Sequence, residues 1–157
     1  MLTRKKLTKE QALQKARHYC AYQERSHAEV KEKLYGFGLY KNEVEELIAS
    51  LIEDNYLNEE RFAIAFAGGK FRMKSWGRKK IEYELKQKQV SAYCIKKALK
   101  QFSEEEYLEA LVKLAEQKRS QIKESNPFVA KQKLRNALMM KGWESNLIEQ
   151  IINNHES

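Results

Sequence analysis

The sequence contains little proline, glycine or cysteine. Its 157 residues include one Pro, six Gly and two Cys. Disulfide-rich scaffolds and collagen-like chains are therefore excluded, because both need far more of these residues. Cys20 and Cys94 stand alone, without the C-x-x-C spacing of a metal or redox motif. We expect both to be buried thiols in a reducing compartment.

Long apolar segments are also absent. No run approaches the roughly 18 residues of a membrane-spanning helix, and the N-terminal MLTRKKLTKE lacks the apolar core of a signal peptide. With 42% hydrophobic and 33% charged residues, the composition is typical of a folded, soluble and mostly helical chain. We therefore expect a cytoplasmic protein.

Catalytic motifs are missing as well. The chain has neither the G-x-x-x-x-G-K-[ST] phosphate loop nor a G-x-G-x-x-G motif. His18 and Cys20 are two residues apart on an expected helix, so they point in different directions and do not form a metal pair. We expect no enzymatic activity, no catalytic or metal-ligating residue, no cofactor and no small-molecule substrate.

Apolar residues recur at helical spacing along the chain. Val44, Leu47, Ile48 and Leu51 fall on one helix face, and no stretch alternates apolar and polar residues for long, which indicates helices and no sheet. Ser, Thr and Asn residues that can accept a hydrogen bond from a free backbone N–H mark the helix starts. The capping pairs are Thr8 with Gln11, Ser26 with Glu29 and Ser103 with Glu106, and the single caps are Asn58, Ser91 and Asn126 before Pro127.

The helical pattern occurs three times. Val30 corresponds to Ile81 and then to Leu134, at offsets of 51 and 53 residues, and Leu39, Val90 and Trp143 share one place in the following joint. The sequence therefore predicts an all-α fold, an elongated array of three tandem three-helix repeats over 1–57, 58–102 and 103–157. The expected helices, about nine in number, cover 8–24, 26–36, 41–54, 58–73, 77–88, 91–102, 104–122, 127–141 and 144–154.

The correspondence is less regular at two places. The leading helices align at an offset of 49 residues, which pairs Leu13 with Phe62 and Ala16 with Ala65, so we expect the turn after them to vary in length. In the second joint, Gln89 stands where the first repeat has Gly38. Because glycine adopts backbone conformations that other residues avoid, we expect a different and less favourable backbone at Gln89.

Positive charge is concentrated in the middle of the chain. Residues 1–60 carry 10 Lys and Arg against 11 Asp and Glu, residues 61–102 carry 12 against 2, and residues 103–157 carry 8 against 9. The whole excess behind the net charge of +8 therefore lies in the middle third. A local basic face of this kind favours a polyanionic or acidic partner.

Within that third, the stretch GGKFRMKSWGRKKI at 68–81 combines cations, aromatic rings and glycines. We take Trp76 and its six cations as candidates for binding nucleic acid or a protein filament, and we name the six cations the basic cluster. Trp76 has two open roles: it packs inward as the entry residue of the next helix, or it stacks on a base. The basic cluster consists of Lys70, Arg72, Lys74, Arg78, Lys79 and Lys80.

Two segments and the three-repeat layout resemble the RecX family of bacterial recombination regulators. The segments are RSHAEVKEKL at 25–34 and EDNYLNEERFAIAFAGGKFRMKSWGRKKIEYELKQK at 53–88. The resemblance spans the whole chain, is most specific from Tyr56 to Leu85 and is weak in the third repeat. Val30, Glu59 and Gln89 depart from the family pattern, and they affect local turns rather than the basic cluster.

The resemblance implies tandem three-helix repeats, no enzymatic activity and one main partner, the RecA filament. Family members bind in the filament's helical groove and inhibit or modulate its ATPase, strand-exchange and co-protease activities, which connects them to homologous recombination, DNA repair and the SOS response. Two other hypotheses remain open. One is a sequence-independent DNA-binding protein, and the other is a helical scaffold for an acidic protein. We expect a monomer that contacts single- or double-stranded DNA through its phosphates.

The repeat pattern makes a prediction about size and shape in solution. Circular dichroism should show mostly helix, and small-angle scattering should give a radius of gyration clearly above the compact value of about 15 Å for this length, because stacked units do not close into a ball. A radius at the compact value would contradict the repeat array.

Overall fold

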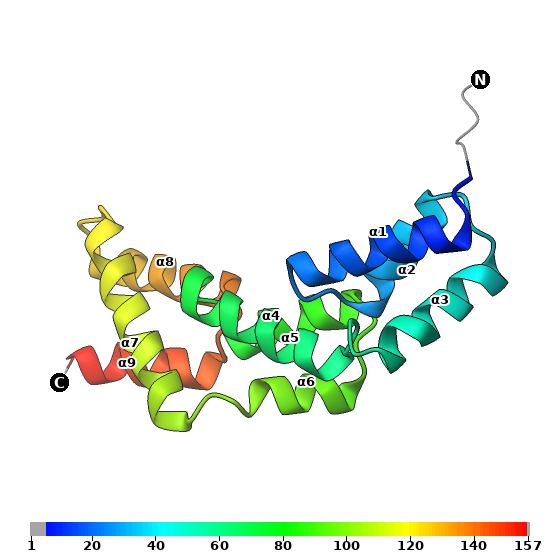
Figure 1. The fold of residues 1–157 in the computed structure, drawn as a ribbon. Helices are drawn as coiled ribbons and strands as arrows, with labels where there is room; N and C mark the ends of the chain where they lie inside the picture. The colour runs from blue at the N-terminus through cyan, green and yellow to red at the C-terminus, as the bar shows by residue number, and fades with distance from the viewer. Residues whose placement is uncertain (1–5, 157) are drawn as a thin grey trace, which may run out of the picture. The chain divides into compact units, whose positions relative to one another are not determined.

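The computed structural model describes residues 6–156, and within them it contains nine α-helices and no strand (Figure 1). The all-α prediction is confirmed, and the ends of each helix lie within three residues of the expected ones. The helices are α1 (Lys9–Tyr22), α2 (His27–Gly36), α3 (Lys41–Glu53), α4 (Glu59–Lys74), α5 (Arg78–Gln87), α6 (Ala92–Leu99), α7 (Glu104–Gln121), α8 (Pro127–Met140) and α9 (Ser145–Glu156).

The predicted caps begin the helices. Thr8 and Ser26 form complete capping boxes with Gln11 and Glu29, while Ser103 shows the first of the two bonds, from the Glu106 N–H to its hydroxyl (3.0 Å). The single caps also form: Asn58 accepts from Arg61, Ser91 from Cys94, and Asn126 from Phe128 and Val129. Each cap satisfies a backbone donor that has no partner within its helix.

The joints between the second and third helices of the three repeats have the same backbone conformation at one position. Gly38, Gln89 and Gly142 all have positive φ, at 88°, 62° and 91°. The expectation of a different backbone at Gln89 is therefore wrong, because Gln89 adopts the same left-handed region without glycine. A side chain in that region costs about 1–2 kcal/mol. Leu39, Val90 and Trp143, which follow, are all buried.

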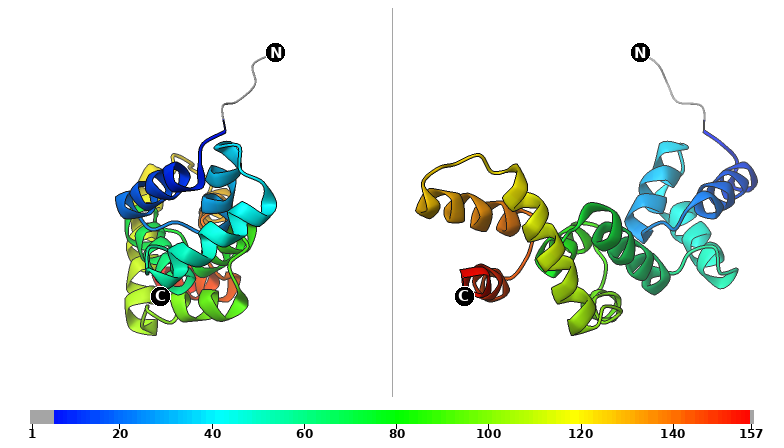
Figure 2. Two further views of the ribbon diagram at one scale, coloured as in Figure 1. Left: turned by 45° about the vertical axis from the view of Figure 1, so that its right-hand side comes forward. Right: turned by 90° about the vertical axis from the view of Figure 1, so that its left-hand side faces the viewer.

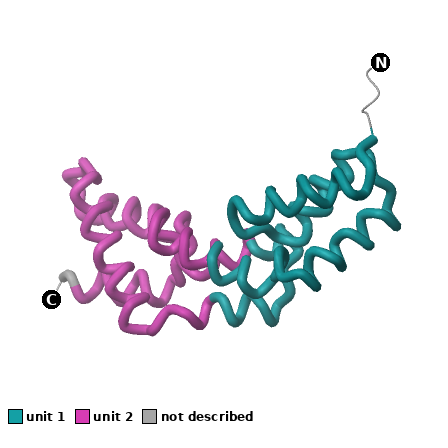
Figure 3. Tube along the Cα trace, viewed as in Figure 1, with its two compact units in different colours: residues 1–66, 85–98 teal, residues 67–84, 99–157 magenta. Residues whose placement is uncertain are grey.

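The chain divides into two compact units (Figure 3). Unit 1 comprises Met1–Phe66 and Leu85–Ala98, and unit 2 comprises Ala67–Glu84 and Leu99–Ser157. In unit 1, α1, α2 and α3 pack against one another, and in unit 2 α7, α8 and α9 do the same (Figures 1 and 2). The division cuts the middle repeat, since α4 and α5 each contribute residues to both units.

The repeated positions form the core of each unit. Val30, Ile81 and Leu134 are all buried, as the pattern predicts. The alignment of the leading helices is wrong, however, because Ala65 is exposed whereas Ala63 and Ala67 are buried. Ala12 and Ala16 therefore correspond to Ala63 and Ala67 at the common offset of 51 residues.

Two smaller findings complete the fold. Cys20 and Cys94 are buried free thiols, as expected. None of the helices in residues 6–156 has the length and apolar character to cross a membrane.

Within unit 2, two turns meet backbone to backbone. The turn between α4 and α5 contains Gly77, and the turn between α8 and α9 contains Gly142. The Gly77 N–H donates to the Lys141 carbonyl (2.8 Å), and the Lys79 N–H donates to the Gly142 carbonyl (3.0 Å). A Cβ on Gly77 would overlap the backbone of Gly142, and a Cβ on Gly142 would overlap Lys80. Gly77 therefore lies where two backbone segments approach closely.

The glycines of the 68–81 stretch should respond differently to alanine. Gly77→Ala should lower the free energy of unfolding by more than about 2 kcal/mol, because its methyl group meets backbone that cannot move alone. Gly69→Ala is the matched control: Gly69 lies inside α4 with open space around its Cβ position, so alanine should stabilise the protein by about 0.5–1 kcal/mol. Equal effects of the two changes in urea unfolding would contradict the close approach.

Candidate nucleic-acid interface

Side chains of the third repeat hold the turn between α4 and α5, the two helices that carry the basic cluster. Helix α4 ends at Lys74, and Ser75 follows with a left-handed φ of 58°. The carbonyl of Lys74 has no partner within α4, and side chains of the third repeat satisfy it and the carbonyl of Ser75. The Lys141 ammonium donates to the Lys74 carbonyl (3.0 Å), and the Trp143 indole N–H donates to the Ser75 carbonyl (3.0 Å).

Below this turn lies a buried group of aromatic rings. Phe71, on the inner face of α4, lies 4.2 Å from Phe102 between ring centroids, and Tyr107 lies 4.4 Å from Trp143. Phe71 also contacts Tyr107 and Trp143, and all four rings are buried. Phe71 is thus a core residue, although it stands within the run of cations, and its burial fixes which face of α4 points outward.

Trp76 lies between two lysines. The Lys70 ammonium is 5.0 Å from the centre of the Trp76 ring, and the Lys80 ammonium is 4.8 Å from it. Cation–π attraction of this kind contributes about 0.5–1 kcal/mol at exposed sites. The ring is half-buried, whereas Trp143 takes the buried position beneath the turn. Trp76 therefore organises charge at the surface more than it fills the core.

Three further cations of the basic cluster are exposed. Arg72, Lys74 and Lys79 have no carboxylate partner among the residues that the structure describes. The guanidinium of Arg72 packs over Gly68, where a Cβ would overlap it, so Gly68 makes room for this side chain. These three cations are free to meet an external anion.

Arg78 differs from the other members of the cluster. Its guanidinium binds Glu144 at 3.1 Å and Glu104 at 2.6 Å, and it lies 3.8 Å from the centre of the Tyr107 ring. Its backbone N–H donates to the Tyr107 hydroxyl (2.8 Å), which in turn donates to Glu144. Burial raises the pKa of Tyr107 well above its usual range, so the hydroxyl stays protonated. Two carboxylates already balance Arg78, and we expect it to position the turn.

Lys118 and Lys141 of the third repeat lie near Lys74 and Lys80 of the basic cluster, and the sequence did not predict this. Burial, followed by the nearby charges of Lys118, Lys80 and Lys74, lowers the pKa of Lys141. Charge counts along the chain conceal both residues, because the third repeat is slightly acidic as a whole. The correspondence of Gly142 with Gly38 is the only sequence signal that bears on Lys141, since it places Lys141 beside a turn.

The arrangement suits a polyanion. Lys74, Lys80 and Lys118 all lie close enough to Lys141 for their charges to lower its pKa, and phosphate groups of a nucleic acid would relieve this repulsion. Such contacts carry no base information. Among residues 6–156, no three His, Cys, Asp or Glu side chains are placed to hold a metal ion together.

Two protein-family models match the part of the chain that contains this site. The model of the second three-helix domain of RecX matches residues 58–99, and the model of the third three-helix domain matches residues 104–152. Together the two matches cover more than half of the chain. The chain belongs to the RecX family. All six cations of the basic cluster lie within the second RecX domain, and Lys118 and Lys141 lie within the third.

Several relatives are named regulatory protein RecX. The protein from Lactobacillus gasseri is 30% identical over 90% of this chain, and the one from Halalkalibacterium halodurans is 33% identical over 86%. These matches cover 52% and 51% of the relatives' own lengths, so the chain spans about half the length of the curated RecX proteins that it matches.

The fold agrees with solved RecX structures. The crystal structure of RecX from Lactobacillus salivarius superposes with a TM-score of 0.82 at 23% identity, covering 93% of this chain and 95% of that one. A second crystal structure of a regulatory protein RecX gives a TM-score of 0.84 over 92% of this chain and 71% of that one. At this identity, the likeness establishes the three-helix repeat fold and nothing further.

The exposed cations should determine how binding to DNA depends on salt. Changing Arg72, Lys74 and Lys79 to Ala should weaken binding to all single-stranded sequences alike, and it should flatten the plot of log affinity against log salt by up to about 2, because each neutralised phosphate contributes about 0.7. Fluorescence anisotropy at several salt concentrations measures both effects.

A variant with the same change of charge serves as the control. Lys96, Lys113 and Lys123 are exposed and lie outside the cluster, and their replacement by Ala should leave the slope nearly unchanged. If both triple variants behave alike, or if neither alters the slope, the basic cluster is a solvated surface and not a nucleic-acid interface.

Proposed function

We propose that this protein regulates RecA by binding the RecA filament on DNA and lowering its ATPase, strand-exchange and co-protease activities. Membership in the RecX family carries this proposal, since the relatives are named regulatory proteins. The proposal places the protein in the cytoplasm, together with the DNA and the recombinase. It requires no chemistry at the site, only binding.

Groove occupancy is the mechanism that we infer. The filament presents DNA phosphates and protein carboxylates, and the exposed Arg72, Lys74 and Lys79 can bind either. Lys70 and Lys80, held against Trp76, extend the same basic surface. The outer repeats then bridge neighbouring RecA subunits, and a filament held in this way hydrolyses ATP more slowly because its subunits cannot change their spacing.

Direct, sequence-independent DNA binding is the second candidate function. The absence of carboxylate partners around Arg72, Lys74 and Lys79 in the described residues favours it, because such cations need no second protein in order to bind phosphate. A scaffold for an acidic protein would use the same charges, although it leaves the two lysines beside Trp76 without a specific role.

RecA's own reaction provides the test of regulation. Adding this protein should lower the rate of RecA's ATP hydrolysis on single-stranded DNA, whereas this protein alone should hydrolyse nothing. The Arg72, Lys74 and Lys79 triple variant should inhibit less, and the Lys96, Lys113 and Lys123 control should inhibit fully. An unchanged RecA rate at saturating protein would overturn the proposal.

A pull-down distinguishes the three functions. The regulator binds RecA best when single-stranded DNA is present, the plain DNA-binding protein captures DNA but no RecA beyond what the DNA carries, and the scaffold captures neither.

A further inference from the structure

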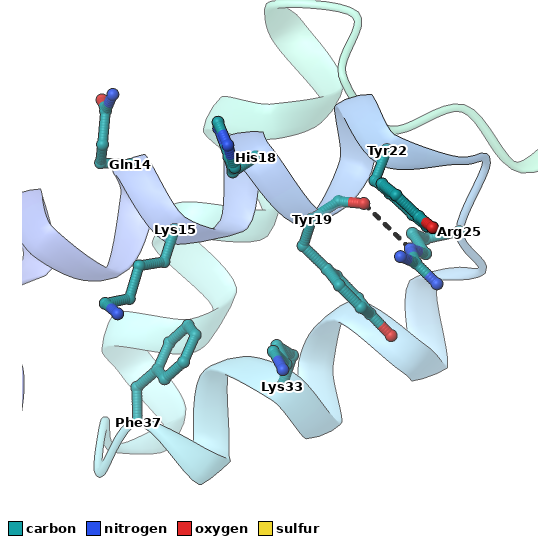
Figure 4. A pocket seen from close by; sticks show the side chains of 8 residues that line it. All are labelled: Gln14, Lys15, His18, Tyr19, Tyr22, Arg25, Lys33 and Phe37. Atoms are coloured by element: carbon teal, nitrogen blue, oxygen red, sulfur yellow. Dashed lines mark hydrogen bonds between the residues drawn. The ribbon is translucent and has the colours of Figure 1, made fainter.

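A pocket of about 550 Å³ lies between α1 and α2 in unit 1, far along the sequence from the basic cluster. Figure 4 shows Lys15 and Tyr19 extending from α1 toward α2, with Lys33 on α2, Phe37 directly after its last residue and Arg25 on the connection between the helices. The lining consists of Gln14, Lys15, His18, Tyr19, Tyr22, Arg25, Lys33 and Phe37.

Cations and aromatic rings alternate in this pocket. The Arg25 guanidinium lies 3.7 Å from the centre of the Tyr19 ring and 5.9 Å from that of Tyr22. The Lys33 ammonium lies between Tyr19 (5.1 Å) and Phe37 (6.0 Å). Arg25 is fixed in place, because its Nε donates to the Tyr19 carbonyl (3.0 Å). Tyr22 remains 83% exposed, so its ring is available to a ligand.

The pocket is cationic. Three cations line it and no carboxylate does, although the sequence around it is slightly acidic as a whole. A neighbouring pocket shares Tyr19, Lys33 and Phe37 and also contains Glu29 and Glu32. Glu29 is engaged by the N–H and hydroxyl of Ser26 and by Lys88. An anion is therefore favoured in the first pocket, whose lining contains no carboxylate.

We propose that this pocket binds one unpaired nucleotide of a single-stranded nucleic acid. The base stacks on the exposed Tyr22 ring and the plane of the Arg25 guanidinium, and the flanking phosphates bind Lys15 and Lys33. Aromatic faces beside cations suit a ligand that is both flat and anionic. An acidic peptide would use the charges but not the rings, and a paired base could not enter, since its faces are covered within the duplex.

This binding goes beyond the proposed regulation of RecA. The pocket lies in unit 1 and the basic cluster in unit 2, and neither a recombinase nor the cluster is needed for a nucleotide to enter. Bare oligonucleotides therefore test the pocket by itself, and the RecA assay can fail while this test succeeds.

The test compares two double variants of the full chain. Tyr22→Ala with Lys33→Ala should weaken binding to a labelled oligothymidine by about five-fold or more, as expected for a lost stack. Tyr93→Ala with Lys97→Ala is the control, because these residues form an exposed cation–π pair on α6 in the same unit (5.6 Å), outside the pocket. The control variant should bind nearly as the unchanged protein does.

An abasic strand of the same length identifies the stacked base. Without bases, the unchanged protein and the Tyr22→Ala variant should bind equally, because only the phosphate contacts remain. The inference is overturned if the pocket variant keeps full affinity for oligothymidine, if it weakens duplex binding just as much, or if it weakens binding to polyglutamate instead. If the double variant has a lower melting temperature than the unchanged protein, the single variant Tyr22→Ala decides the result, because the exposed Tyr22 ring contributes little to folding.

Discussion

The contact between Gly77 and Gly142 is the constraint on which the rest of unit 2 depends. Two turns approach so closely that neither tolerates a Cβ, and backbone hydrogen bonds from Gly77 and Lys79 join them. This contact sets where α5 begins and therefore the direction in which its first cations point. Lys141 then donates to the carbonyl of Lys74, the last residue of α4, and Trp143 donates to the carbonyl of Ser75 in the turn, so the third repeat holds the turn that joins the cation-bearing helices of the second.

Holding so many like charges together opposes folding, and the structure offsets this repulsion unevenly. Arg78 is paired with two carboxylates beside Tyr107, and Lys70 and Lys80 share the ring of Trp76. Arg72, Lys74 and Lys79 are left exposed to solvent. Some cations are thus paired within the fold, whereas others remain exposed and can bind a polyanion.

The sequence predicts the helices, their caps and the buried repeat positions well, because each of these depends on neighbours within a few residues. The register of the leading helices fails, since small alanines and not the larger Leu13 mark their buried face. At the site, the sequence predicts the cluster but not the separate role of Arg78, because Glu104 and Glu144 are distant in sequence. Lys141 is missed for the same reason.

Amide hydrogen exchange tests most directly whether the third repeat holds the turn between α4 and α5. Lys79 is the second residue of α5, a position whose N–H has no acceptor within its own helix, yet it donates to Gly142. Ala28 holds the same position in α2 and has no such acceptor among the described residues. We predict slow exchange at Lys79 and Gly77 and fast exchange at Ala28. Equally fast exchange at all three amides would contradict the account.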